Sequence, residues 1–194
     1  MGKQFILLML FSIATMAIGK AIPKETYLQN ISLAKEKVTQ FQLYVQDILS
    51  GPNVTIIQVA WGNYTLTSPT SFGLVVVFDD PVRTRSNPDS EIVGRAQGLV
   101  TFASLEGISL HMTHDIVFTS GEYNGSTLNL VGRNPLLRDY HEFSVVGGSG
   151  TFRLARGFVV ARTVSNSTYN TIFEYNVTVI HYSFVNQLKI GASK

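Results

Sequence analysis

Cysteine is absent from all 194 residues of this chain. The absence excludes a disulfide framework, a thiol nucleophile and a thiolate metal site, so the fold must be stabilised by its core. Charged residues are also scarce, at 14% of the sequence, and the formal net charge is only +2. No stripe of lysine and arginine is visible, which argues against a nucleic acid as partner.

A short apolar stretch near the N-terminus sets the expected compartment. It follows Lys3 and ends in the small-x-small sequence Ala17-Ile18-Gly19. This pattern predicts a secretory signal peptide over residues 1–19 rather than a membrane span, because the stretch is short and polar residues follow it. We therefore expect a secreted, extracellular protein without a membrane anchor, with a flexible leader over residues 20–37 and one domain over residues 38–194.

Six Asn-x-Ser/Thr sequons agree with a secretory route, because N-glycans are added along it. Their asparagines are Asn30, Asn53, Asn63, Asn124, Asn166 and Asn176. Several of them flank turn-like residues, where a glycan would have room. Asn176 lies inside an apolar, strand-like run, and we expect it to be the least used of the six.

Sustained helical periodicity is also missing outside the signal peptide, and the hydrophobic pattern predicts β-strands throughout the domain. Period-two or fully apolar runs occupy residues 39–49, 56–60, 72–78, 94–103, 108–118, 127–131, 142–146, 151–163 and 171–182. Clusters of Gly, Pro, Asn and Asp separate these runs, and one of them, Asp80-Pro81, predicts a turn. Short strands at this spacing predict an all-β barrel or sandwich.

Two features favour the barrel. Glycines recur inside the strand-like segments 93–98 and 145–157, where they mark the bulges, bends and close backbone contacts that curl a sheet. The run 72–78 is apolar on both faces, so one face should line the core and the other should meet a second surface. In a small barrel that surface would belong to another subunit. We therefore expect a homo-oligomer, and keep a β-sandwich as the alternative fold.

The same glycine segments carry a family resemblance. Together with Phe78-Asp79-Asp80-Pro81 and the Tyr-Asn-Gly-Ser-Thr turn at residues 123–127, they resemble the plant dirigent family, in the family's order along the chain. The resemblance implies an eight-stranded antiparallel β-barrel, similar to dirigent and allene-oxide-cyclase folds, that assembles as a dimer or trimer.

The resemblance also implies a function without a cofactor in the plant apoplast. Dirigent proteins do not oxidise their ligands. An external laccase or peroxidase generates phenoxy radicals from monolignols such as coniferyl alcohol, and the barrel directs their coupling to optically active lignans. A preference of about 1.4 kcal/mol between two coupling faces already gives tenfold selectivity.

Asp47 is the candidate catalytic residue. Strand alternation places it on the same face as Leu43 and Val45. Burial in an apolar lumen raises the pKa of a carboxyl group toward the range useful for general acid catalysis. The alternatives are that a bulge turns Asp47 outward or that it caps the turn at Ser50-Gly51. The dirigent family has an aspartate at this place in its first strand.

Asp79 and Asp80 have a simpler interpretation, since aspartate before proline at a strand end is common turn chemistry. Adjacent strand residues face opposite sides, so these two carboxylates should not share a proton. We expect Asp80 to contribute at most to the rim of the pocket.

The resemblance implies four further pocket positions. In lignan-forming members, Asn134 and His141 are replaced by aspartate and arginine, and Val100 and Phe102 by two tyrosines. Other branches carry Asn at the first position, usually with arginine at the second. Asn134 cannot act as an acid, whereas His141 can be charged or neutral. The pocket is therefore less polar than that of lignan-forming members.

The sequence His111-Met112-Thr113-His114-Asp115 suggests a metal cluster at first sight. On a strand, however, histidines three residues apart face opposite sides, so we expect no metal site. His114 shares its face with apolar residues, and a core histidine is the simpler interpretation, with a pocket role as the alternative.

Two other functions stay open. The first is an isoflavanol dehydratase, resembling pterocarpan-forming dirigent proteins. In it, Asp47 would protonate a leaving hydroxyl, and the resulting quinone methide would close to a ring. The asparagine at position 134 slightly favours this function. The second is a wall-associated or carbohydrate-binding protein. The single Trp61 argues against it, since sugar sites usually stack several aromatic side chains.

Overall fold

The structure is a computed structural model that describes residues 31–183. The predicted signal peptide, Asn30 and most of the predicted leader lie outside the described residues. Lys35–Ser183 form one compact unit. Within residues 31–183, no helix is long and apolar enough to cross a membrane.

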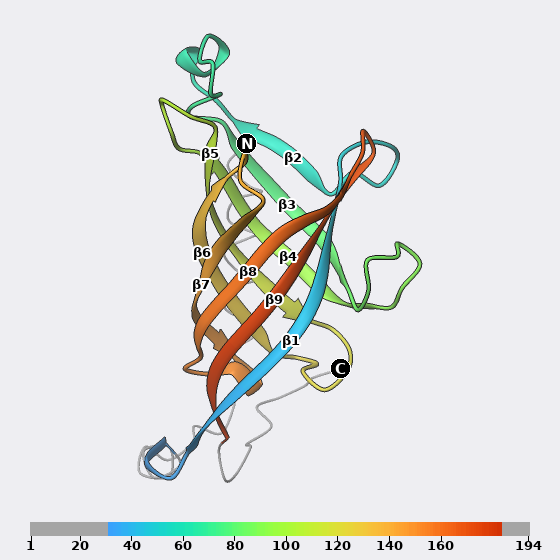
Figure 1. Cartoon of the computed structure of the whole chain (residues 1–194), viewed down its shortest axis with the longest axis vertical. Coiled ribbons are helices and arrows are strands. Elements are labelled where there is room, and N and C mark those ends of the chain that lie inside the picture. The colour runs from blue at the N-terminus through green and yellow to red at the C-terminus, as the bar shows by residue number, and fades with distance from the viewer. Residues whose placement is uncertain (1–30, 184–194) are drawn as a thin grey trace, which may run out of the picture. The chain divides into compact units, whose positions relative to one another are not determined.

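The unit is a closed antiparallel β-barrel (Figure 1). The strands are β1 (Lys35–Ile48), β2 (Ile56–Ala60), β3 (Val75–Arg83), β4 (Ile92–Phe102), β5 (Ser109–Phe118), β6 (Thr127–Pro135), β7 (Tyr140–Ser149), β8 (Arg156–Asn166) and β9 (Asn170–Ser183), with short 3₁₀ turns at Asn63–Leu66 and Gly150–Phe152. They follow the order β1-β9-β8-β7-β6-β5-β4-β3-β2, and an additional β1–β3 pairing closes the barrel. The predicted eight-stranded barrel is confirmed, with β2 as one extra strand, and the sandwich is wrong.

The strands β1 and β2 pair with successive parts of the same edge of β3. Val45 of β1 pairs with Val82, and Ile56 of β2 pairs with Phe78. Both pairings are antiparallel, so β1 and β2 run in the same direction along β3 with a loop between them. This loop leaves the barrel after Ile48, next to Asp47.

The predicted turn at Asp80-Pro81 is wrong, because β3 runs through both residues to Arg83. Proline lacks an N–H and is tolerated in a strand only where no ladder bond is required. Pro81 pairs with Arg95 on one side. On the other side it lies where β3 changes partner from β2 to β1, so the missing donor disrupts no paired residue.

Other strand limits differ from the prediction by a few residues. The strand β1 begins at Lys35, so residues 35–37 of the predicted leader are paired with β9. The strand β8 begins at Arg156 rather than at residue 151, because the 3₁₀ turn Gly150–Phe152 precedes it. The fully apolar run at residues 72–78 enters its strand only at Val75.

The glycine segments shape the sheet as expected. The ladder between β6 and β7 shifts between Asn129 and Leu130, which pair with Gly147 and Val145 and leave Val146 as the extra residue of a bulge. Gly98 allows a close approach instead: a Cβ there would lie 2.4 Å from the Cβ of His114. The glycine therefore makes the room that this histidine side chain occupies.

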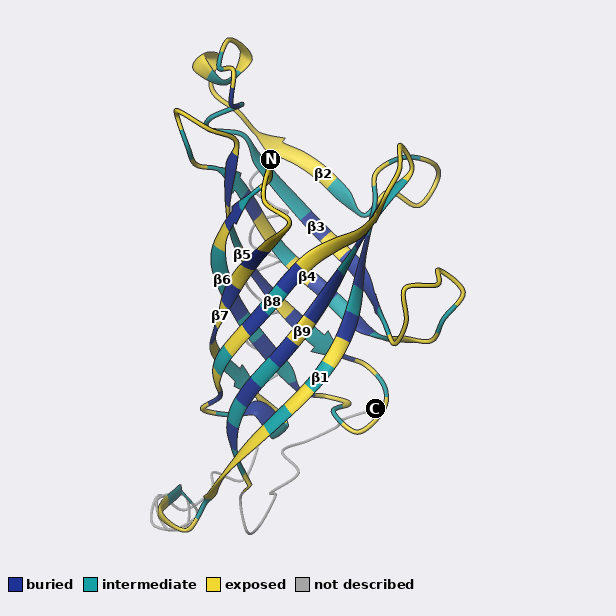
Figure 2. Cartoon of the chain, viewed as in Figure 1, coloured by how far each residue is buried: buried dark blue, intermediate teal, exposed yellow. Residues whose placement is uncertain are grey.

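Buried and exposed residues alternate along the barrel strands (Figure 2), and different residues fill the two ends of the lumen. One end is filled by a tight aromatic cluster, hereafter the closed end, formed by Phe41, Phe118, Tyr123, Phe152 and His181. The other end, hereafter the mouth half, is bounded by the loops that follow β1, β4, β6 and β8. There the core residues Phe102 and Met112 are partly buried.

Candidate functional site

Polar side chains in the lumen gather in the mouth half. Strand alternation points them inward among apolar neighbours, and most of them are buried. They are Asp47, Asp80, His114, Asn134, His141 and Tyr175. The barrel thus brings together five of the predicted site residues from five different strands.

Asp47 and Asp80 form a carboxyl pair. The two side chains lie within hydrogen-bonding contact, and a hydrogen bond between two carboxyl groups needs a proton on one of them. Asp80 is 1% exposed, and its Oδ2 is buried without a hydrogen-bond donor. Burial, with the charge of Asp47 next, raises the pKa of Asp80 to about 9. Asp80 is therefore the protonated member.

Burial also raises the pKa of Asp47, while its hydrogen bond with Asp80 opposes the rise. The side chain of Asp47 is the less buried of the two. The pair thus shares one proton between Asp80, which lies deeper in the lumen, and Asp47, which lies nearer the mouth. Such a pair can orient a ligand hydroxyl or donate a proton to it.

Thr55 fixes the carboxyl pair to the backbone. Its hydroxyl donates to Oδ1 of Asp80 and accepts from the backbone N–H of Ile48 at 3.0 Å. The backbone of Thr55 also bonds to Ile48 and Asp79. This one residue therefore ties the end of β1 to β3 and holds the two aspartates together at the base of the loop.

Two histidines lie on either side of Phe143. The ring centroid of Phe143 is 5.0 Å from that of His114 and 4.9 Å from that of His141, with edge-to-face geometry in both contacts. Burial, with a smaller contribution from nearby His141, lowers the pKa of His114 to about 4. Burial alone lowers the pKa of His141 to about 4. Both rings are therefore neutral near pH 7.

Tyr175 connects the histidines with the carboxyl pair. Its hydroxyl lies 3.5 Å from Nε2 of His114. Burial raises its pKa well above the usual value, and the charges of Asp47 and Asp80 add to the rise. Nδ1 of His114 is buried without a partner. The neutral tyrosine and histidine thus supply further hydrogen-bonding groups without adding charge.

The remaining predicted positions line the same half. Asn134 is 5% exposed, and its Nδ2 contacts the sulfur of Met112 at 3.7 Å. Val100 and Phe102 belong to the apolar core there. His111 is exposed while His114 is buried, as strand alternation predicted.

Asp80 lies deeper than the pocket rim at which the sequence analysis placed it. The prediction that Asp79 and Asp80 face opposite sides is confirmed, since Asp79 pairs with Arg95 on the exposed face. Thr55, Tyr175 and the partnership of Asp47 with Asp80 were not predicted from the sequence. Only the pairing of β1 with β3 could have indicated the partnership of the two aspartates, and the predicted turn at Asp80-Pro81 was incompatible with that pairing.

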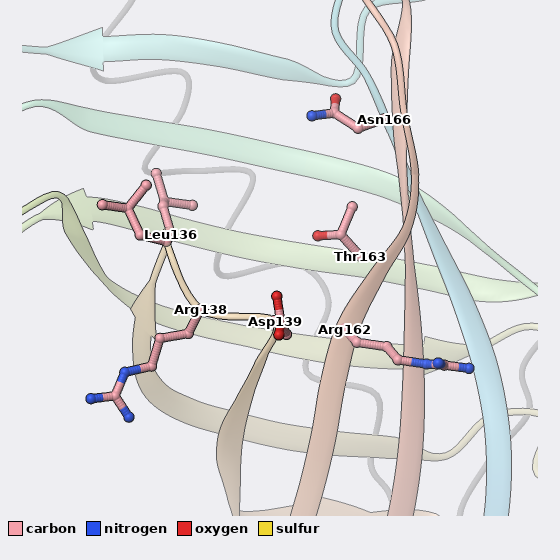
Figure 3. Close-up of a pocket in the computed structure, with 7 residues that line it drawn as sticks. Leu136, Arg138, Asp139, Arg162, Thr163 and Asn166 are labelled. Carbon is pink, nitrogen blue, oxygen red and sulfur yellow. The ribbon is translucent and has the colours of Figure 1, made fainter.

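A separate hollow of about 430 Å³ lies between the β6–β7 loop and the end of β8. It is lined by Leu136, Leu137, Arg138, Asp139, Arg162, Thr163 and Asn166. Figure 3 shows Arg138 and Arg162 pointing away from each other, and Arg162 is held by Glu174. None of the predicted ligand-binding residues lines this hollow.

Comparison with known proteins identifies relatives along most of the chain. The model of the family described as dirigent-like protein matches residues 38–180. Dirigent protein 23 of Arabidopsis thaliana is 42% identical over 149 residues, which are 76% of this chain and 80% of that protein. Pterocarpan synthase 1 of Glycyrrhiza echinata is 37% identical over 165 residues, which are 81% of this chain and 88% of that protein.

A solved structure shares the architecture. The pterocarpan synthase dirigent protein GePTS1 superposes with a TM-score of 0.74 at 34% identity, covering 85% of this chain and 100% of its own. A second, PsPTS1, gives a TM-score of 0.68 at 36% identity, covering 76% of this chain and 97% of its own.

Proposed function

The chain belongs to the dirigent-like protein family, and from that premise we propose that it directs the stereochemistry of phenoxy-radical coupling. The ligands would be monolignols such as coniferyl alcohol, the products optically active lignans, and an external laccase or peroxidase would supply the radicals. The observation that carries this proposal is the carboxyl pair Asp47–Asp80 in an otherwise apolar lumen.

The pair suits the task of holding a radical in one orientation. Asp47 presents a hydrogen-bonding oxygen toward the mouth, where it can accept from a ligand hydroxyl, while the apolar wall packs against the aromatic ring. Phe102 and Met112 supply this wall in the mouth half. Because a difference of about 1.4 kcal/mol between two orientations gives tenfold selectivity, one such anchor is sufficient.

An isoflavanol dehydratase is the second candidate, because the same pair carries a proton and pterocarpan synthases are among the relatives. The acid would protonate the leaving hydroxyl as its C–O bond breaks, releasing water. Loss of the phenolic proton would give a neutral quinone methide, and a second hydroxyl would add to it and close the ring. No oxidant is consumed in this reaction.

We further propose that the protein is secreted, N-glycosylated and a homo-oligomer. All five described sequon asparagines, Asn53, Asn63, Asn124, Asn166 and Asn176, are exposed, as a glycan requires. An apolar stripe on the outside of the barrel supports the oligomer: Ile57 pairs with Val77, Val77 pairs with Leu99, and Ile57 and Leu99 are exposed. Such a stripe is suited to contact with a second subunit.

Two assays separate the candidates. Purified protein is incubated with coniferyl alcohol and a laccase, and in parallel with an isoflavanol and no oxidant. Products are resolved on a chiral column. An enantiomeric excess in the first assay supports radical coupling, and ring closure in the second supports the dehydratase. Racemic lignan in the first and unreacted isoflavanol in the second would contradict both.

Asp47→Asn tests the anchor itself. The change removes ionisation and keeps the hydrogen-bonding shape, so the selectivity or the dehydratase rate should fall tenfold or more while the fold is kept. Asp79→Asn is the matched control, because Asp79 lies one residue from Asp80 on the exposed face. If Asp47 is only a turn cap, the variant loses about 1 kcal/mol of stability and keeps its product profile.

A further inference from the structure

The mouth half contains acidic groups but no lumen-facing cation among residues 31–183. Arg95 and Arg162 lie on the outer face, where Asp79 and Glu174 hold them. Arg133 is exposed and alternates with Asn134, which faces the lumen. Arg138 is exposed on the β6–β7 loop.

The basic side chains of this region are instead two histidines that lack an acidic partner. His141 is 8% exposed, and its ring rests against Phe143. Continuing the β6–β7 register from Gly132 and Phe143 places Asn134 opposite His141. His141 and Asn134 therefore line one wall of the mouth half, and Asp47 and Asp80 line another.

We propose that His141 is a specificity-determining residue that makes the lumen select uncharged hydroxylated ligands and reject carboxylates. The inference rests on the proposed function, because it concerns the phenolic ligands of the same site. A carboxylate in the lumen would meet no cation to pair with and would be repelled by Asp47. An uncharged hydroxyl, in contrast, can donate to Asp47 and bond to the histidine rings.

The energetic reason is the cost of burying a charge. A carboxylate that leaves water for an apolar site without a cation keeps most of its desolvation penalty, whereas a hydroxyl needs only one or two hydrogen bonds. Neutral His141 and Asn134 can supply such bonds but cannot neutralise a charge. An arginine at position 141 would stay charged and could pair with a carboxylate in a bidentate manner.

The first test needs only the unaltered protein and three ligands with one skeleton: coniferyl alcohol, ferulic acid and methyl ferulate. Binding is measured by titration calorimetry at pH 7. We expect the alcohol and the ester to bind at least tenfold more tightly than the acid, because only the acid is charged. An acid that binds as tightly as its ester would overturn the proposal.

The second test is His141→Arg, with His111→Arg as the matched control on the exposed side of β5. Circular dichroism and the melting temperature verify the fold. The His141 variant should reduce the preference for ester over acid by tenfold or more, and the control should keep it. An unchanged preference in a folded His141→Arg protein would also overturn the proposal. If the variant fails to fold, the three-ligand comparison still decides.

These outcomes separate this inference from the proposed function. Rejection of the acid combined with racemic products and no ring closure would retain the selectivity and contradict the function. Equal binding of acid and ester combined with stereoselective products would contradict the selectivity and retain the proposed function. No binding of any of the three ligands would contradict both.

Discussion

The two ends of the lumen use their interior positions differently. At the closed end, Phe118 and Phe152 pack ring against ring, and the polar groups of His181 are bonded to Thr39 and Thr151. In the mouth half, Asp80 and His114 each keep one buried atom without a donor or acceptor. Unsatisfied buried groups destabilise a fold. The comparison indicates that the closed end contributes more stability than the mouth half, as the ligand site proposed for the mouth half would require.

Phe152→Ala should have the largest effect on stability. Phe152 is fully buried and its ring contacts those of Phe41, Phe118, Tyr123 and His181 at the closed end, so truncation should lower the free energy of unfolding by about 3–5 kcal/mol. Phe102→Ala in the mouth half should have a smaller effect, since Phe102 is only partly buried. Denaturant unfolding measures both. Equal losses would remove the distinction between the two ends.

The pH dependence of stability should come from the mouth half. The pKa of His114 is about 4 in the folded protein and about 6.5 in the unfolded chain. The unfolded state therefore binds the proton first, and stability falls as the pH drops from 6.5 to 4, by about 3 kcal/mol for this residue. Unfolding of the protein and of His114→Gln is compared at pH 7 and pH 4. A decrease that His114→Gln leaves unchanged would contradict the assignment.

Asp80→Asn should stabilise the protein while it harms the site. The pKa of Asp80 is raised to about 9, so the stability that its proton brings is present in acid and is lost as the pH rises toward 9. The amide cannot ionise, and the variant should be more stable than the unaltered protein at pH 8, with little gain near pH 4. Melting temperatures at both pH values test this. A less stable variant at pH 8 would mean that the carboxyl is structural.

Arg95→Ala gives the baseline for residues outside the lumen. The ion pair of Arg95 with Asp79 is exposed, and exposed pairs contribute about 0.2–1 kcal/mol. The loss should be of this size and should decrease further in 0.5 M salt. Chemical unfolding at low and high salt measures it. A loss as large as that of Phe152→Ala would show that the outer face also determines stability.

The sequence indicated the barrel because strand alternation and internal glycines are local signals. It also placed Asp47 on the apolar face of its strand, as the burial of Leu43 and Val45 shows. The pairing of Asp47 with Asp80 depends on which strands become neighbours, and that information is not local. The expected turn before Pro81 was wrong for the same reason: proline fits this strand only because β3 changes partner there.

The first and last strands of the barrel are neighbours along their whole length. All 14 residues of β1 pair with β9, from Lys35 opposite Ser183 to Ile48 opposite Asn170, and the two ribbons run side by side in Figure 1. Contacts between such distant parts of a chain form slowly, because the intervening loop must be ordered first. During synthesis the edge of β1 that pairs with β9 therefore stays unpaired until β9 has been made. A chain of this kind will depend on chaperones until its last strand has emerged.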